Sequence, residues 1–333
     1  GAFGFDSTRC GVRHWRPMSS NNSTHDAAAA QASLGLSLLM LVSLGTLWGG
    51  ITAMAKFVAL AGVPALGYAF WQTVGAGIIL LLACLLRGRP PPMSRAHLRH
   101  YLVIGAIGSA IPTTNLFYAL SNLSAGLVAL VITTVPLFTY LLSLSVRLEG
   151  FDWRRAAGIC LGFAGALLVL LPKGSLPSSE MIPFVVLAFL SPFFYSLNSV
   201  YAMKFHPPQM DSLHAATGMM VASSLMLLPA SLATGTFHPL WRDFALVDGL
   251  ILLHMFLAAL TFHMYFVLLR RTGPVYFSQV AFIVTLVAVG LGVVLFDERH
   301  SLWIWAALAL VFAGVALVNW RHRAQSTRGG EAA

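Results

Sequence analysis

The chain has 333 residues, of which 58% are hydrophobic and only 9% are charged. An ordinary soluble domain carries roughly 25% charged residues, and a soluble globule of this size could not bury so much apolar surface. The composition therefore excludes a soluble enzyme, a nucleic-acid-binding domain and a disordered chain. The net charge of +9 does not argue for nucleic acid as a partner, because Lys and Arg stand in short segments between long apolar runs, as membrane insertion requires.

In chain order, residues 1–33 are polar, and we expect a disordered cytosolic tail there. Ten apolar runs follow, each about as long as the roughly 20 residues that cross a ~30 Å hydrocarbon core. They predict spans at about 34–61, 64–86, 101–121, 124–145, 154–171, 182–203, 212–233, 246–269, 274–296 and 302–320, before a second cytosolic tail at 321–333. The sequence therefore predicts an all-α polytopic membrane protein whose short connections pack consecutive helices antiparallel.

The distribution of basic residues predicts the orientation of these spans. Of the 20 Lys and Arg residues, 16 fall on the side of the two tails, three fall on the opposite side, and Lys56 lies inside a span. Cytoplasmic loops carry the excess of positive charge. We therefore expect both termini to be cytosolic.

The two halves of the sequence repeat each other. Residues 163–165 and 312–314 both read Phe-Ala-Gly, 149 positions apart, and Glu149 falls on Glu298 at the same offset. With an offset of 148, Lys56 falls on Lys204. We expect two five-helix repeats at 34–171 and 182–320, and an odd number of spans must invert the second copy relative to the first. Inverted repeats with a midplane site are typical of secondary transporters.

Several short motifs occur in a characteristic order. They are Leu47-Trp48-Gly49, Ala119-Leu120, Ser124-Ala125, Thr134-Val135-Pro136-Leu137, Glu149, the series Gly158, Gly162 and Gly165, and in the second copy Glu298 and Gly314. On these residues the chain, over roughly 34–320, resembles a ten-span permease of the drug/metabolite transporter superfamily, EamA type. It departs from the family pattern at Thr285, where the proline of span 4 is usually repeated in span 9. The resemblance implies an integral protein of the bacterial cytoplasmic (inner) membrane, commonly an exporter of amino acids or related metabolites.

Polar residues inside spans are the first candidates for a binding site, because a polar side chain in lipid needs a partner or a wet cavity. Tyr68, Trp71 and Gln72 share one face of span 2, and an interfacial aromatic belt is the alternative interpretation. In span 1, Trp48, Thr52 and Lys56 also share a face. Lys56 could bind an anionic group, or its ammonium could reach the nearby membrane surface.

Other candidates are weaker. Asn115 and Asn198 could bind a substrate or join helices, Tyr195, Tyr276 and Gln279 could line a site, and His263 could carry a proton. His254 and His263 are nine residues apart on opposite faces of one helix and cannot share a metal. Gly49, Gly50 and Pro136 are candidate hinges. No acidic residue lies deep in a span, which argues against coupling through a buried carboxylate.

The favoured function is a secondary transporter, more specifically an exporter, of small metabolites such as amino acids, which works by alternating access with a midplane site between the repeats. A passive channel or facilitator for small polar solutes is the alternative, and an intramembrane enzyme has little support because no HExxH, GxSxG or P-loop motif occurs. The expected partners are a small-molecule substrate and the bilayer, without cofactor, catalytic residue or metal. The small-residue stripes of spans 5 and 10 favour packing within the chain, with a homodimer contact as their second use.

Overall fold

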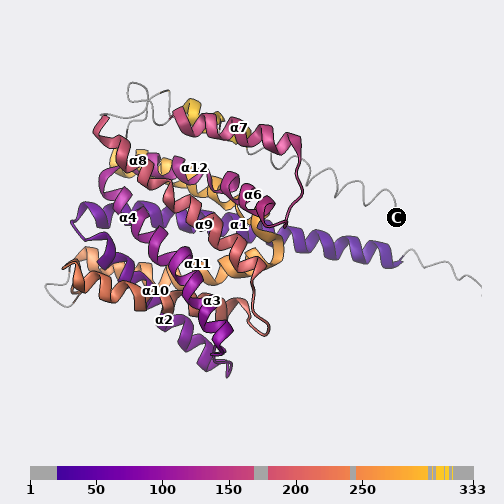
Figure 1. Cartoon of the computed structure of the whole chain (residues 1–333), viewed down its shortest axis with the longest axis horizontal. Coiled ribbons are helices and arrows are strands. Elements are labelled where there is room, and N and C mark those ends of the chain that lie inside the picture. The colour runs from indigo at the N-terminus through magenta and orange to yellow at the C-terminus, as the bar shows by residue number, and fades with distance from the viewer. Residues whose placement is uncertain are drawn as a thin grey trace, which may run out of the picture.

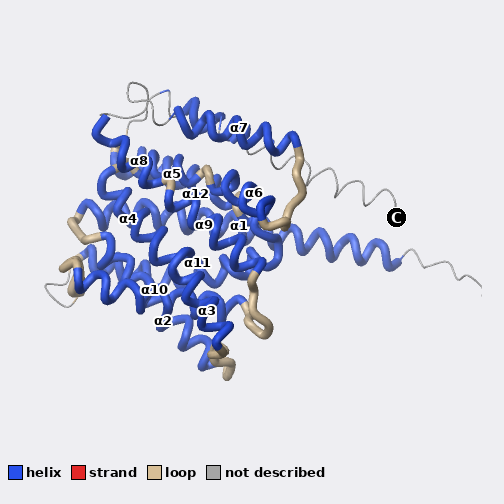
Figure 2. Tube along the Cα trace, in the orientation of Figure 1, coloured by secondary structure: helices blue, strands red, loops and turns tan. Residues whose placement is uncertain are grey.

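The computed structural model describes residues 21–168, 179–240 and 245–298, together with 302, 305–310, 312–314 and 317 (Figure 1). All regular structure in these residues is helical (Figure 2). The helices are α1 (Asn21–Leu60), α2 (Ala65–Leu86), α3 (Arg95–Gly105), α4 (Ile111–Asn122), α5 (Ala125–Ile132), α6 (Val135–Ser145), α7 (Trp153–Leu168), α8 (Ile182–Ala188), α9 (Leu190–Lys204), α10 (Ser212–Ala233), α11 (Leu246–Phe277) and α12 (Val280–Phe296).

The helices agree with the predicted spans. Seven helical segments of the described residues are long and apolar enough to cross a membrane, and shorter apolar helices cover Val280–Phe296 and Trp305–Gly314. With α7 they account for the ten predicted spans, and the all-α polytopic class is confirmed. One boundary differs, because α1 begins at Asn21 and residues 21–33 are helical where we expected part of a disordered tail. The alanine-rich stretch at 27–32 has high helix propensity, which explains the longer helix. Residues 1–20 and 321–333 lie outside the described part.

Helix contacts between the halves occur in matching pairs: when the two repeats are exchanged, each contact has a counterpart. Helix α1 packs on α12, and its mirror pair is α9 on α6. Helix α2 packs on α11, and its mirror pair is α10 on α3 and the following π-helical turn at Ala106–Ala110. Helices α2 and α10 occupy equivalent positions and pack on each other. The pseudo-twofold axis of the inverted repeat therefore passes between α2 and α10.

Several spans are broken near the middle of the bundle. Span 4 is divided between α5 and α6 at Thr133 and Thr134, directly before Pro136, and each threonine Oγ1 donates to a carbonyl three residues back. Span 6 is divided between α8 and α9. The second copy has no break at Thr285, whose hydroxyl bonds to Ala129 and Ala281 carbonyls; its chain turns earlier, between α11 and α12. The absence of a proline at 285 permits the continuous helix there.

Small residues set two close helix contacts. Helix α1 runs without interruption through Gly49 and Gly50, and a side chain at Gly49 would overlap Val287 of α12. A side chain at Gly314 would overlap the backbone of Gly158 and Gly162 in α7. The stripes of spans 5 and 10 are therefore used within the chain.

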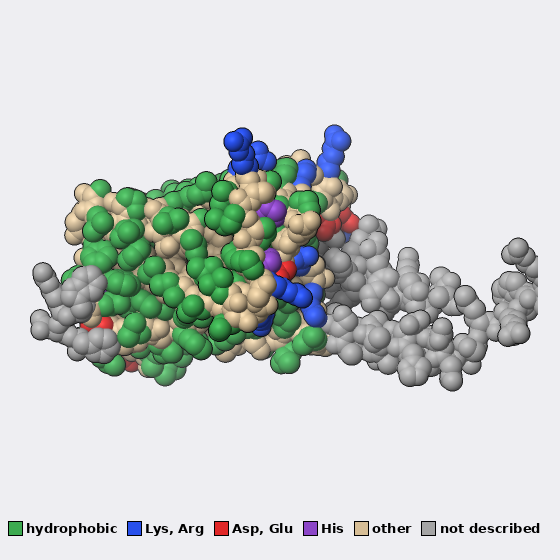
Figure 3. Space-filling model, turned by 90° about the horizontal axis from the view of Figure 1, so that it is seen from below, with side chains coloured by type: hydrophobic (Ala, Val, Ile, Leu, Met, Phe, Trp, Pro, Cys, Tyr) green, Lys and Arg blue, Asp and Glu red, His purple; other side chains and the backbone are tan. Residues whose placement is uncertain are grey.

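The face of the bundle seen in Figure 3 is largely covered by hydrophobic side chains. Exposed side chains such as Leu82, Phe256 and Val294 would form an unfavourable patch in water, and in a bilayer they face lipid. Described Lys and Arg side chains gather toward the end from which α1 projects (Figure 3). The fold is that of an integral membrane protein with one basic end.

Candidate functional site

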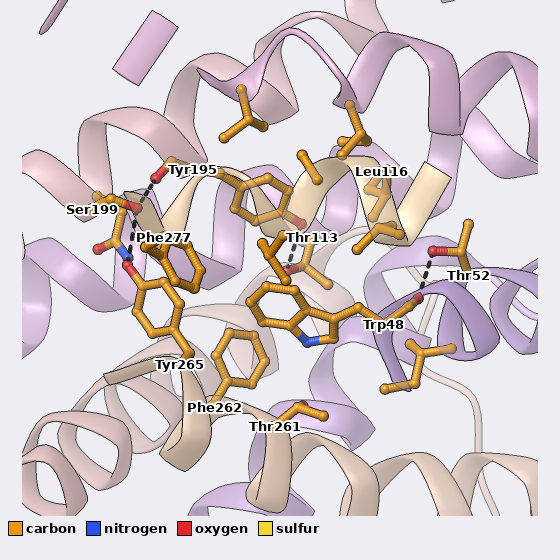
Figure 4. A pocket seen from close by; sticks show the side chains of 18 of the residues that line it. Trp48, Thr52, Thr113, Leu116, Tyr195, Ser199, Thr261, Phe262, Tyr265 and Phe277 are labelled. Atoms are coloured by element: carbon orange, nitrogen blue, oxygen red, sulfur yellow. Dashed lines mark hydrogen bonds between the residues drawn. The ribbon is translucent and has the colours of Figure 1, made fainter. Parts of the chain in front are cut away.

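A cavity of about 120 Å³ lies inside the bundle (Figure 4). Its walls come from spans 1 to 4 of the first repeat and spans 6, 8 and 9 of the second. The lining residues are Trp48, Ile51, Thr52, Gln72, Gly108, Thr113, Leu116, Phe117, Ile132, Val135, Tyr195, Asn198, Ser199, His254, Thr261, Phe262, Tyr265, Phe277, Val280, Ala281 and Val284. The cavity thus lies between the two repeats, beside the break in span 4 and the turn between α11 and α12.

Aromatic rings form one wall of this cavity. The indole of Trp48 lies 6.1 Å from the ring centroids of Phe262 and Tyr265 and 6.2 Å from that of Phe277 (Figure 4). Tyr195 approaches from span 6. Tilted and edge-on rings expose both faces and edges to the cavity, a surface suited to a flat apolar solute.

Most polar groups in the wall are already bonded to protein. Thr52 Oγ1 donates to the Trp48 carbonyl at 2.9 Å, Asn198 Nδ2 donates to the Tyr265 hydroxyl at 2.9 Å, and Ser199 Oγ donates to the Tyr195 carbonyl at 2.9 Å. Two acceptors differ: Gln72 Oε1 and Asn198 Oδ1 are buried and have no hydrogen-bond partner among the residues that the structure describes. Buried polar atoms are nearly always paired, so these two oxygens are exceptions within the packing around the cavity.

A histidine and a tyrosine connect the cavity with its surroundings. His254 lines the cavity, and its Nδ1 lies 2.7 Å from the hydroxyl of Tyr68. The Tyr68 ring in turn stacks on Phe117, another lining residue, at 4.4 Å. Among the lining residues that the structure describes there is no Asp, Glu, Lys or Arg. The wall therefore combines a largely apolar surface with a few polar groups, and its described part has no Asp, Glu, Lys or Arg.

The structure brings together five of the residues that the sequence singled out. Trp48, Thr52, Gln72, Tyr195 and Asn198 line the cavity, and Tyr68 lies directly behind His254. Their role in binding stays a prediction.

Lys56 lies elsewhere, at the end of the bundle opposite the basic loops. Its Nζ donates to the carbonyls of Leu120 and Leu123, both at 2.7 Å, where α4 ends. Glu298 accepts hydrogen bonds from the backbone N–H groups of Ala125 and Gly126 at the start of α5. A lysine and a glutamate, one from each repeat, therefore bracket the turn between spans 3 and 4.

Trp71 and Asn115 also point away from the cavity. Trp71 Nε1 donates to the His238 carbonyl in the loop after α10. Asn115 Nδ2 donates to the Leu187 carbonyl and to Ser191 Oγ, joining span 3 to span 6. Asn115 also borders a groove of about 1050 Å³ formed by the α1–α2 turn, span 3 and the end of α10.

The remaining candidates lie toward the basic end or in helix packing. His263 is on the part of α11 near Arg87 and Asp211, Tyr276 packs on the apolar cluster around Tyr265, and Gln279 Nε2 bonds to the Val275 carbonyl. Gly49, Gly50 and Pro136 are hinges only by prediction, although Pro136 does follow a helix break.

Sequence reasoning missed most of the aromatic wall. The positions 254, 261, 262 and 265 of α11 line the cavity together, and they recur at the helical spacing that defines one face. In span 8, the spacing of residues on one helix face therefore selects His254, Phe262 and Tyr265 as lining residues, and it does not select His263.

Comparison with known proteins agrees with this architecture. The sequence model of the EamA-like transporter family matches residues 35–171 and 182–320. The chain is 30% identical over 290 residues to a protein of Escherichia coli strain K12 named as the uncharacterized inner membrane transporter YedA, covering 84% of this chain and 89% of that protein. It is 25% identical over 292 residues to the uncharacterized transporter YvbV of Bacillus subtilis strain 168, covering 86% and 92%. A solved crystal structure with 21% identity shares the fold, with a TM-score of 0.59 over 85% of this chain and 96% of the other.

Proposed function

Because the chain belongs to the EamA-like transporter family, we propose that it is a secondary transporter of the cytoplasmic (inner) membrane that exports a small organic metabolite. The proposed site is the central cavity, and the proposed mechanism is alternating access of that cavity to the two membrane faces. The names of two relatives as transporters support transport rather than enzymatic activity. Export is the direction that the family resemblance implies.

The observation that carries this proposal is the composition of the cavity wall. Residues of both repeats meet around one small space, and in transporters built from inverted repeats the substrate lies near the midplane between the copies. Two nearly equivalent halves can exchange conformations, so that each end of the cavity opens in turn. A single space between the copies then serves both membrane faces.

The ends of the bundle offer groups that could hold these two conformations. At one end Lys56 and Glu298 fasten the turn between spans 3 and 4. At the other end the equivalent Lys204 bonds to the Val146 carbonyl, at the end of span 4. We propose that these contacts change when the repeats exchange states, and that the helix breaks beside the cavity, including that before Pro136, absorb the motion.

The decisive experiment combines metabolite profiling with counterflow. Cells that overexpress the protein should accumulate a solute in the medium, and cells that express Thr261→Phe, which fills the cavity, should not. The solute found in this way should show saturable counterflow in liposomes that contain the purified protein. Unsaturated flux without counterflow would identify a channel, and identical media from both strains would remove the cavity from the transport path.

A further inference from the structure

We propose that the contact between α5 and α12 is a latch that holds the cavity closed at the end of the bundle opposite the basic loops, and that the equivalent contact at the basic end closes less firmly. We call the contact between α5 and α12 the outer seam. Its counterpart after exchange of the repeats, the contact of α6 with residues 274–281, is the inner seam. This inference rests on the proposed function, because it assigns a preferred state to the alternating access of the same cavity.

The outer seam lies between the cavity and one end of the bundle. Helix α5 begins at Ala125 and reaches the cavity with Ile132, and α12 lines the cavity with Val284 and ends shortly before Glu298. The two helices belong to different repeats and pack on each other through small buried side chains. Separating α5 from α12 would therefore open the cavity toward this end.

Three hydrogen bonds cross the outer seam from one repeat to the other. Thr285 Oγ1 donates to the Ala129 carbonyl at 2.8 Å. At the end of the seam, the backbone N–H groups of Ala125 and Gly126 donate to Glu298 Oε1 and Oε2 at 2.6 and 3.0 Å. The carboxylate thus lies at the start of α5, where the helix dipole favours a negative charge. All three bonds must break before the repeats can separate here.

A glycine makes room for the Glu298 carboxylate. The Glu298 N–H donates to the Gly292 carbonyl at 3.2 Å, and a Cβ atom at Gly292 would lie only 2.6 Å from Glu298 Oε2. The same backbone bond recurs 149 positions earlier, where the Glu149 N–H donates to the Ser143 carbonyl at 3.4 Å. The two glutamates therefore follow equivalent helix ends, but only Glu298 has a glycine beside its carboxylate.

The inner seam differs at three positions that matter for these contacts. At the offset of 149, the residues that replace Thr285, Ala125 and Gly292 are Pro136, Pro274 and Ser143. Pro136 has no hydroxyl, Pro274 has no N–H, and Ser143 carries a Cβ atom where Gly292 has none. The inner seam therefore lacks the donors of two of the three hydrogen bonds. This also gives a role to Thr285, the position at which the chain departs from the family pattern.

The two seams should therefore differ in strength. A neutral hydrogen bond and a bond to a carboxylate together change an equilibrium by at least roughly tenfold. The inner end has one contact between the repeats that the outer end does not match, from Lys204 Nζ to the Val146 carbonyl. It is exposed, and exposed charged contacts contribute little. The cavity should therefore open to the outer face less often than to the cytosolic face.

The reactivity of a cysteine in the cavity tests this inference. Val284→Cys places a thiol in the cavity wall, in the full-length chain with its three native cysteines replaced by alanine. A membrane-impermeant methanethiosulfonate with a quaternary ammonium group labels this parent protein from the outer face in right-side-out spheroplasts and from the cytosolic face in inside-out vesicles. We expect labelling from the outer face to be at least roughly tenfold slower.

Variants of the two seams should shift these rates. We expect labelling from the outer face to rise roughly fivefold in Thr285→Val and roughly tenfold in Glu298→Gln. Pro274→Ala restores an N–H at the inner seam, so it should speed labelling from the outer face and slow labelling from the cytosolic face. Two matched controls should leave both rates unchanged. They are Thr73→Val, whose hydroxyl bonds to carbonyls of its own helix, and Asp297→Asn, which changes an exposed carboxylate next to Glu298.

The opposite results would overturn the inference. Equal or faster labelling of the parent from the outer face contradicts the preferred closed end. Unchanged labelling in both outer-seam variants, or an equal rise in their controls, contradicts the latch. If Glu298→Gln does not fold, Thr285→Val and Pro274→Ala still decide the question.

Counterflow of the solute found by metabolite profiling, measured with the same proteins, separates this inference from the proposed function. Counterflow in variants whose labelling is unchanged refutes only the latch. Loss of counterflow for every solute in the wild-type protein refutes the transporter itself.

Discussion

Replacing Lys56 with methionine separates a structural from a substrate-binding role for this residue. Methionine keeps most of the length and volume of the side chain but removes the ammonium. In the structure the ammonium donates hydrogen bonds to Leu120 and Leu123, and no cavity residue is among its partners. We therefore expect Lys56→Met to lower stability and to leave the affinity of a cavity ligand unchanged.

The expected loss follows from the two hydrogen bonds. Each bond from a charged donor contributes ~1.5–3 kcal/mol, and because Lys56 is only half-buried we take the lower value, which gives about 3 kcal/mol for two bonds. A change of this size lowers the melting temperature by roughly 5–10 °C in a chain somewhat larger than 150–250 residues. The nearby charge of Glu298 adds to the loss, because the variant leaves that carboxylate without the ammonium that interacts with it.

The assay is thermal unfolding of the purified protein followed by intrinsic fluorescence, with binding of the solute found by metabolite profiling measured in parallel. Lys204→Met is the matched control, since Lys204 occupies the equivalent position in the other repeat and donates to one carbonyl from an exposed site. Exposed charged contacts contribute at most about 1 kcal/mol, so this variant should melt within a few degrees of the wild type. An unchanged melting temperature in Lys56→Met, together with loss of ligand binding, would refute the structural role.

Three further predictions concern other parts of the chain. Thr261→Phe, which fills the cavity, should abolish counterflow of the transported solute, whereas Trp71→Phe should not, because the Trp71 indole bonds to the His238 carbonyl outside the cavity; equal effects on counterflow would contradict this division. Gly314→Leu should push span 10 away from span 5, where a Cβ atom overlaps backbone, and should lower the melting temperature without changing ligand affinity; a wild-type melting temperature would exclude this contact. Burial lowers the pKa of His206 from 6.5, so the unfolded chain takes up a proton near pH 6.5 that the folded chain resists, and stability should fall as the pH is lowered through that value. His206→Gln should melt with a smaller decrease between pH 7.5 and pH 5.5, and an equal decrease in both proteins would assign the acid sensitivity to other groups.

Much of the fold could be predicted from the sequence. Apolar runs of membrane-crossing length located the spans, because a backbone in lipid must satisfy its own hydrogen bonds and therefore forms helices. The repeated Glu149 and Glu298 and the repeated Lys56 and Lys204 indicated two copies, and the exchange of helix contacts between the halves agrees with an inverted arrangement.

The site could be predicted only in part. Helical spacing identifies residues that share a face, and Trp48 and Thr52, which share a face of α1, both line the cavity. The same spacing grouped Trp71 with Gln72, but adjacent residues differ by about 100° around a helix axis. Gln72 therefore lines the cavity, whereas the side chain of Trp71 donates a hydrogen bond to the His238 carbonyl in a loop.

The sequence by itself determined that the chain crosses the membrane as helices in two related halves, because both properties depend on composition and periodicity along the chain. Only the tertiary structure decided which polar groups remain unpaired, because a hydrogen-bond partner can come from any helix of the bundle. Lys56 donates hydrogen bonds to carbonyls on span 3, and His254 is hydrogen-bonded to Tyr68 on span 2. Gln72 Oε1 and Asn198 Oδ1 have no partner among the described residues, and spacing along the chain does not reveal that difference.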